Sequence, residues 1–343
     1  MQDNASRGRI KAAWTLVILA PVCAELTFTA VAVPQTWIAL PLLLPMYGAG
    51  VLLVREAVVR AGGGWPSLLL LGLAYELAED GLGLQALTSP SMYDAAEWSL
   101  RVLGFNVTYW LAQVGIHVVF SVLIPVLLMD MLFPRHRSRP YLRTGGLVAT
   151  AAFALLGVAG LRYGIAATQD PGYQAPTVAL IAFVAVIAAL AVLALRVLPR
   201  RSRSAAPVAP VVSLAPRPVG VGAFGAAATI VFLGLLMPAG LRPGGPVFGD
   251  AVPLALPVAG SLATGAVTIW LLRRWTADPA WSDAHRLWLV GGAMAAHTAF
   301  MVPGHGLSGL VTAAVTIAAE VFALLWLARA GGRGERPAGK LRY

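Results

Sequence analysis

The stretch WPSLLLLGLAYELAEDGLGL, residues 65–84, is long and apolar enough to cross a bilayer as one helix. It nevertheless contains three acids, Glu76, Glu79 and Asp80. A carboxylate near the bilayer centre is costly in contact with lipid, so such residues face a protein interior or a wet cavity and usually serve a function. The stretch therefore predicts a membrane helix inside a bundle, with a buried acidic site.

The composition of the whole chain is that of an integral membrane protein. Hydrophobic residues make up 58% of the sequence, charged residues only 12%, and the mean hydropathy is +0.76. The net charge of +10 does not indicate nucleic-acid binding, because the basic residues fall in short segments between apolar stretches. A single cysteine, Cys23, excludes an intramolecular disulfide and a cysteine-based metal site.

Apolar segments of about 20 residues predict an all-α bundle of ten transmembrane helices. They are expected at residues 13–33, 37–54, 65–86, 105–133, 145–162, 176–197, 219–240, 254–272, 287–303 and 307–328. With both termini in the cytoplasm, 22 of the 25 lysines and arginines fall on the cytoplasmic side; the exceptions are Arg101, Arg162 and Arg242. Omitting one helix would invert every later loop, so this bias supports the topology.

The first apolar run follows Arg7, Arg9 and Lys11 and is too long for a typical signal peptide, so we expect an uncleaved first helix. A Pro-, Arg- and Ser-rich segment later divides the chain. The expected parts are a six-helix bundle with the acidic site (1–198), a cytoplasmic linker (199–218), a four-helix bundle (219–330) and a basic tail (331–343). On the outer side, Asp94 and Glu97 resemble a capping box, so residues 89–106 form either a short interfacial helix or a plain loop.

The acids of residues 65–86 share one helix face, because residues three and four positions apart are neighbours. At 1.5 Å per residue, Glu79 lies roughly 21 Å and His117 roughly 25 Å above the cytoplasmic ends of successive, antiparallel helices, so the two should meet. Glu25 is expected near the level of Glu76. Acids at one depth cannot all be ionised, which suits acid–base chemistry on water, a proton relay or a purely structural polar network.

Two further residues lie centrally in the last two predicted helices. His297 and Glu320 either complete the same site from the second half of the chain or form an isolated packing pair. The chain has no HExxH motif or comparable paired spacing, so neither a metal nor a cofactor is expected.

An acidic pair in one helix, followed in a later helix by a histidine with a small polar residue four positions on, resembles the CAAX-protease and bacteriocin-processing (CPBP) intramembrane proteases. The resemblance covers residues 65–133 and rests on Glu79-Asp80 and on His117 with Ser121. It implies that the acidic pair activates water and that His117 stabilises an oxyanion. The arginine that follows the acidic pair in that family has no counterpart here, and Ser121 replaces the usual amide.

Three functions are compatible with these residues. An intramembrane hydrolase would use Glu79, Asp80, His117 and Glu76 on a membrane-embedded or lipidated substrate, with Glu25 and Ser121 beside them. A proton-coupled transporter would also use His297 and Glu320, and a non-catalytic scaffold would use none of them. The expected location is the plasma membrane, specifically the bacterial inner membrane, with the lipid bilayer as the partner.

Overall fold

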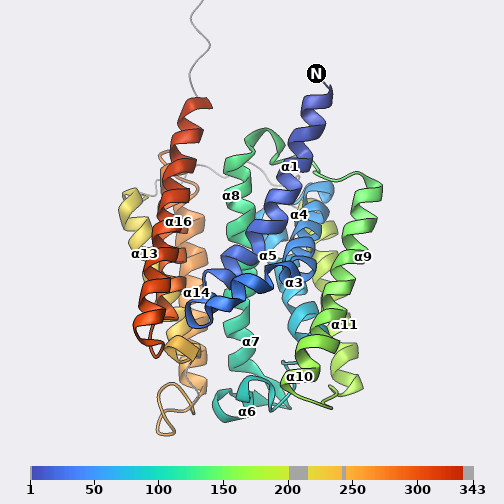
Figure 1. Ribbon diagram of the computed structural model, residues 1–343, viewed down its shortest axis with the longest axis vertical. Coiled ribbons are helices and arrows are strands. Elements are labelled where there is room, and N and C mark those ends of the chain that lie inside the picture. Colours follow the sequence, from blue (N-terminus) through green and yellow to red (C-terminus); the bar gives the residue numbers. More distant parts are fainter. Residues whose placement is uncertain (1, 201–214, 242–244, 335–343) are drawn as a thin grey trace, which may run out of the picture.

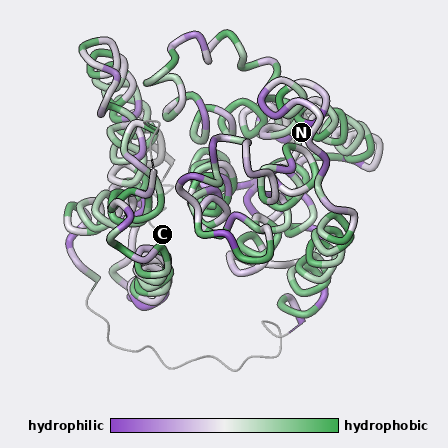
Figure 2. The backbone as a smooth tube through the Cα atoms, turned by 90° about the horizontal axis from the view of Figure 1, so that it is seen from below, coloured by the Kyte–Doolittle hydropathy of each residue, from purple (hydrophilic) through white to green (hydrophobic). Residues whose placement is uncertain are grey.

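The computed structural model describes residues 2–200, 215–241 and 245–334, and these are almost entirely helical (Figure 1). Residues 201–214 of the expected linker and 335–343 of the expected tail lie outside the described residues. Most of the backbone carries hydrophobic residues (Figure 2). The start of α1 and the end of α16 lie at the same end of the molecule (Figure 1).

The first half of the chain consists of helices broken by short π-helical segments. These elements are α1 (Gln2–Pro21), η1 (Val22–Leu26), α2 (Thr29–Ala32), η2 (Pro34–Ala39), α3 (Leu40–Leu43), η3 (Leu44–Ala49), α4 (Gly50–Ala61), α5 (Trp65–Glu76), η4 (Leu77–Gly83), α7 (Val107–Gln113), η6 (Val114–Leu123) and α8 (Ile124–Leu132). Of the η segments in this half, η1, η3, η4 and η6 are π-helical. Because a π-helical turn bonds each residue to the fifth along, it rotates the side chains that follow.

The second half continues with longer helices. Its elements are η7 (Pro134–His136), α9 (Thr144–Gly160), η8 (Leu161–Ala166), α10 (Ala167–Gln169), α11 (Thr177–Val192), η9 (Leu193–Val197), α13 (Pro218–Leu236), η10 (Ala239–Leu241), α14 (Ala255–Trp275), α15 (Asp283–Phe300) and α16 (Gly306–Gly334). Helix α15 packs against α13 and α16, and α14 packs against α13. Helices α13–α16 contact the rest of the bundle where α13 meets α7 and where α16 meets α2 and α8.

The segment between η4 and α7 contains a short helix, η5 and α6 (Met92–Asp94 and Ala95–Trp98), and an antiparallel hairpin of β1 (Arg101–Val102) and β2 (Phe105–Asn106). The helix alternative for residues 89–106 is thus confirmed, in shorter form. The capping box is wrong, because the Asp94 side chain makes no capping hydrogen bond and its backbone is left-handed. The buried Asn106 amide instead donates to the carbonyls of Ala86 and Ser89, and so fixes the hairpin over the end of η4.

Seven helices in the described residues are long and apolar enough to cross a membrane. They are Pro34–Ala61, Val107–Leu132, Thr144–Gln169, Thr177–Arg200, Pro218–Leu236, Ala255–Trp275 and Gly306–Arg329. The outward faces of several expose large apolar side chains, such as Leu155, Val178 and Phe322, at least 70% exposed. Such faces need lipid rather than water around them, which supports an all-α, multi-pass membrane bundle.

Three more segments were expected to span. Residues 65–86 and 287–303 are helical over most of their length, but the first carries three acids and the second carries polar residues along α15. Residues 13–33 form a helix that breaks at Thr27 and Phe28. By length and composition alone, these three segments are not among the candidate membrane spans. Ten crossings with cytoplasmic termini therefore stay a prediction.

Candidate functional site

The three acids of residues 65–86 are fully buried inside the first half of the bundle. Glu76 ends α5, and Glu79 and Asp80 lie in η4, each with 0% exposure. Helix α11 and η8 close the outer side of η4, where a Cβ atom on Gly81 would lie 3.0 Å from Phe183 and one on Gly83 would lie 3.2 Å from Leu161. Leu161 therefore fills the space beside Gly83.

His117 faces this acidic turn from η6. Its Nδ1 atom lies 3.5 Å from the Glu79 carboxylate and its Nε2 atom 3.8 Å from the Asp80 carboxylate, with the ring almost completely buried. The helix-depth argument that Glu79 and His117 should meet is confirmed. Each ring nitrogen thus lies within 4 Å of an acid, so the protonation of the three groups is coupled.

Aromatic donors hold two of the carboxylates from the same helix that carries His117. The Trp110 indole donates to Glu76 (2.9 Å), the Tyr109 hydroxyl donates to Asp80 (3.2 Å), and the Gln113 amide donates to the Tyr109 hydroxyl (2.8 Å). Sequence reasoning missed these residues. Tyr109 and Trp110 lie two helical turns before His117 in the sequence. Because buried Trp and Tyr side chains need hydrogen-bond partners, this pair could have indicated contacts with the acids.

Glu25 joins the group through Tyr47 rather than directly. The hydroxyls of Tyr47 and Thr29 each donate to Glu25 at 2.8 Å, and the Tyr47 ring centroid lies 5.6 Å from that of His117. Tyr47, absent from the sequence-based site, therefore connects Glu25 of η1 to the His117 ring of η6.

Ser121 lies on η6 four residues after His117 and is completely buried. Its hydroxyl has no hydrogen-bond partner among the described residues, and neither do the two Glu79 oxygens, one oxygen each of Glu76 and Asp80, and Nδ1 of His117. Buried polar groups are normally satisfied, so a cluster of open donors and acceptors calls for a functional explanation.

Most of the ionisable groups at the site lie in segments that deviate from α-helix. Glu25, Tyr47, Glu79 with Asp80, and His117 with Ser121 lie in η1, η3, η4 and η6, four separate π-helical segments. Single π turns are rare and concentrate at functional sites, where they re-aim side chains. Here they allow the adjacent Glu79 and Asp80 both to reach His117.

His297 and Glu320 form a second group. The His297 ring is stacked between Phe120 (3.8 Å between centroids) and Phe28 (4.3 Å), and both of its nitrogens lack hydrogen-bond partners among the described residues. Glu320 accepts a hydrogen bond from Thr298 (2.8 Å). No hydrogen bond or ion pair joins this group to the Glu79 cluster in the described part of the chain, although Phe120 lies one helical turn from His117.

Within the described residues, no three His, Cys, Asp or Glu side chains are arranged so that they could hold a metal ion. The His117 ring lies 3.5 Å from the Glu79 carboxylate and 3.8 Å from the Asp80 carboxylate, close enough for ion pairing but too far for direct hydrogen bonds. The site as built offers carboxylates, an imidazole and phenolic hydroxyls, which are groups for moving protons.

The bundle and its buried acids define a multi-pass α-helical membrane protein. The chain belongs to an uncharacterized membrane protein family, whose model matches residues 15–333. This match covers both halves of the bundle but is not a match to the CPBP proteases, so that relation stays a resemblance. Comparison with curated proteins found no match, and comparison with solved structures found none either.

Proposed function

We propose that the protein is a membrane-embedded hydrolase that cleaves an amide or ester bond in a membrane peptide or a lipidated substrate. The observation that carries the proposal is the convergence of Glu79 and Asp80 on His117, within 3.5 and 3.8 Å, in a buried site with open hydrogen-bonding atoms. All of these groups come from the first half of the chain, as expected for one enclosed reaction centre rather than a path through both halves.

In this reaction Glu79 accepts a proton from water while the water oxygen bonds to the substrate carbonyl carbon. His117 donates a hydrogen bond to the oxyanion that forms, and Asp80 shares its proton with this pair. When the bond to the leaving nitrogen or oxygen breaks, the proton held by Glu79 moves to the leaving group. Trp110, Tyr109 and Tyr47 position the carboxylates.

The test uses the purified full chain in nanodiscs with a panel of fluorogenic transmembrane and lipidated peptides. Glu79→Gln and His117→Ala should each reduce turnover at least about 100-fold, the usual scale for loss of a general base or an oxyanion donor. Glu320→Gln serves as the matched control, because it alters a partly buried acid outside the cluster. Equal turnover by Glu79→Gln and the native protein would reject the hydrolase.

A proton-coupled transporter is the second candidate, and a specific observation favours it. The second group places a buried histidine in α15 and a partly buried acid in α16, with the histidine ring stacked on Phe120. Protonatable residues in both halves suit alternating access. In proteoliposomes with an imposed pH gradient, a transporter would lose flux in Glu79→Gln and Glu320→Gln alike, whereas the hydrolase would lose activity only in the first.

A further inference from the structure

A basic cavity lies at the end of the molecule where α1 begins and α4 ends. Its volume is about 550 Å³. It is lined by Arg9, Arg60, His136, Arg139, Pro140, Leu142, Arg143 and Thr144. Three separate parts of the chain, α1, α4 and the segment that joins η7 to α9, thus contribute four arginines to one concave surface, and none of its described lining residues is an acid.

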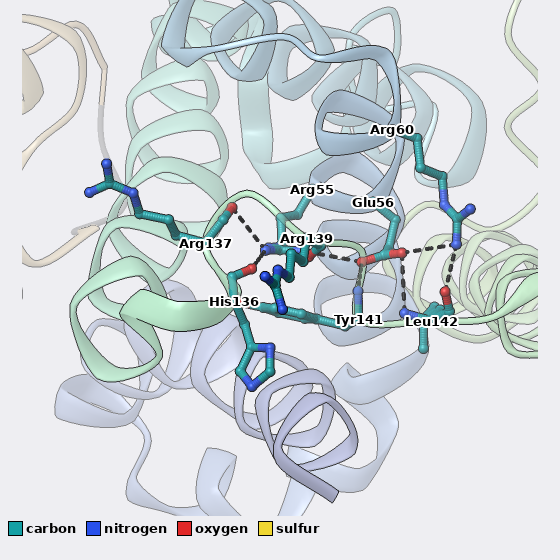
Figure 3. A network of polar contacts seen from close by, with 8 residues as sticks. All are labelled: Arg55, Glu56, Arg60, His136, Arg137, Arg139, Tyr141 and Leu142. Carbon is teal, nitrogen blue, oxygen red and sulfur yellow. Dashed lines mark hydrogen bonds and ion pairs between the residues drawn. The ribbon is translucent and has the colours of Figure 1, made fainter. Parts of the chain in front are cut away.

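A buried ion pair, Arg55 with Glu56, holds the chain segment that lines the cavity (Figure 3). Arg55, 1% exposed, donates to the carbonyls of His136 (2.8 Å), Arg137 (3.1 Å) and Arg139 (3.1 Å). Its neighbour Glu56 accepts from the backbone amides of Tyr141 (2.6 Å) and Leu142 (3.2 Å). These five hydrogen bonds fix the backbone of residues 136–142, so the wall of the cavity is formed before any ligand binds.

The charges at the cavity are mostly uncompensated. Arg60 shares the carboxylate of Glu56 (3.3 Å), but the guanidinium groups of Arg9, Arg139 and Arg143 have no ion-pair partner among the described residues. Partial burial, together with Arg139 and Arg9, lowers the pKa of His136 below its usual range. A cavity with several converging arginines and no acid is complementary to a ligand with more than one negative charge or several anionic oxygens.

The cavity also lies at the level where lipid headgroups are expected. Thr144, in its wall, is the first residue of the apolar span Thr144–Gln169, whose side chains Val148 and Leu155 are 64% and 70% exposed. An acyl chain could follow that apolar face while the headgroup occupied the cavity. The amides at the start of α9, a 17-residue helix, favour an anion at the same place.

We propose that this cavity binds a phosphate group, with Arg139 and Arg143 as its principal ligands and Arg9 and Arg60 on the opposite side. The shared chemistry is a phosphate ester or inorganic phosphate. Its source is either the headgroup of an anionic membrane lipid or a phosphate dissolved in the adjacent water. The proposal is independent of the hydrolase and involves none of its residues.

The test measures binding to the full chain purified in detergent. One arm titrates phosphatidylglycerol, with phosphatidylcholine as the zwitterionic reference, and counts bound lipids by native mass spectrometry; the other titrates inorganic phosphate by calorimetry. Arg139→Gln/Arg143→Gln is compared with Arg273→Gln/Arg274→Gln, which removes two exposed arginines at the end of α14. Arg139→Lys/Arg143→Lys keeps the charge, and thermal unfolding confirms that each variant is folded.

We expect the first double variant to bind phosphatidylglycerol about tenfold to thirtyfold more weakly, as two basic contacts to an anionic lipid imply. The α14 control should stay within about twofold, and the lysine variant, which keeps both charges, should retain most of the lipid binding. If Arg139→Gln/Arg143→Gln loses phosphate binding but keeps lipid binding, the cavity binds a dissolved phosphate rather than a lipid headgroup. Equal binding of both probes by the Arg139→Gln/Arg143→Gln variant and the native protein would overturn the proposal.

Discussion

The guanidinium carbon of Arg55 lies 3.3 Å from the centroid of the Tyr141 ring, so a buried cation is stacked on an aromatic residue 86 positions later in the chain. Glu56 completes the arrangement by pairing with Arg55 at 3.1 Å and accepting two backbone amides of the same segment. The ion pair is therefore the anchor of residues 136–142, and its integrity can be tested separately from any ligand.

Replacing Glu56 by Gln should destabilise the folded protein by about 3 kcal/mol or more. The change leaves the buried Arg55 cation without its counter-charge, which costs far more than loss of a surface pair. Thermal and denaturant unfolding in detergent would measure it. The matched control is Arg286→Gln, which breaks an exposed pair with Asp283 (39% and 62% exposed) and should cost less than about 1 kcal/mol.

Close contact between α13 and α15 predicts a second stability effect. A Cβ atom on Gly292 would lie 1.9 Å from the backbone oxygen of Gly222, so Gly292→Ala must push the two helices apart. We expect a loss of about 1–3 kcal/mol, the usual cost of overpacking. Gly160→Ala is the control, since no described atom lies within 4 Å of that Cβ position. Similar unfolding midpoints for the two variants would contradict this packing.

Asp278 predicts a pH dependence outside the membrane spans. Hydrogen bonds from the backbone amides of Ala215 and Ala280 lower the pKa of this exposed carboxyl below its usual value. A group with a lowered folded-state pKa stabilises the protein above its unfolded pKa and loses that effect as the pH falls through the folded pKa. Asp278→Ala should therefore lower the unfolding midpoint slightly at pH 7, and the difference should disappear well below about pH 4. A difference that persists in acid would contradict the assignment.

The sequence predicted much of the site because depth in a membrane can be counted. Residues on successive antiparallel helices meet when they lie at equal distances from the same side, which is how Glu79 and His117 could be paired in advance. For His297 and Glu320, by contrast, the sequence allows either membership of the same site or a separate group. The stacking of His297 between Phe28 and Phe120 now favours a separate group.

Other parts of the site could not be predicted, for physical reasons. A period of 3.6 residues assumes regular α-helix, whereas Glu79, Asp80 and His117 lie in π-helical segments that rotate the following side chains. Tyr47 contacts Glu25 across 22 residues, and Arg55 contacts the carbonyl of Arg139 across 84. Such contacts depend on how distant helices pack, which no local pattern records.

His297 offers the sharpest separation of the two candidate functions. Its ring fills the space between Phe120 and Phe28, while both nitrogens lack hydrogen-bond partners among the described residues. His297→Phe keeps an aromatic ring in the stack and should leave the unfolding free energy within about 1 kcal/mol, whereas His297→Ala should lower it by about 2–3 kcal/mol. Thermal unfolding of both variants in detergent would measure this packing role.

The same His297→Phe variant can then be assayed for activity, because its stability should be close to native. If the protein is a hydrolase built around Glu79 and His117, turnover should stay within about twofold, since the ring contributes packing and no proton. If protons cross the protein through the second group, a phenyl ring cannot carry them and pH-driven flux should fall to background. A folded His297→Phe protein that loses peptide cleavage would contradict the assignment of catalysis to the first half of the chain alone.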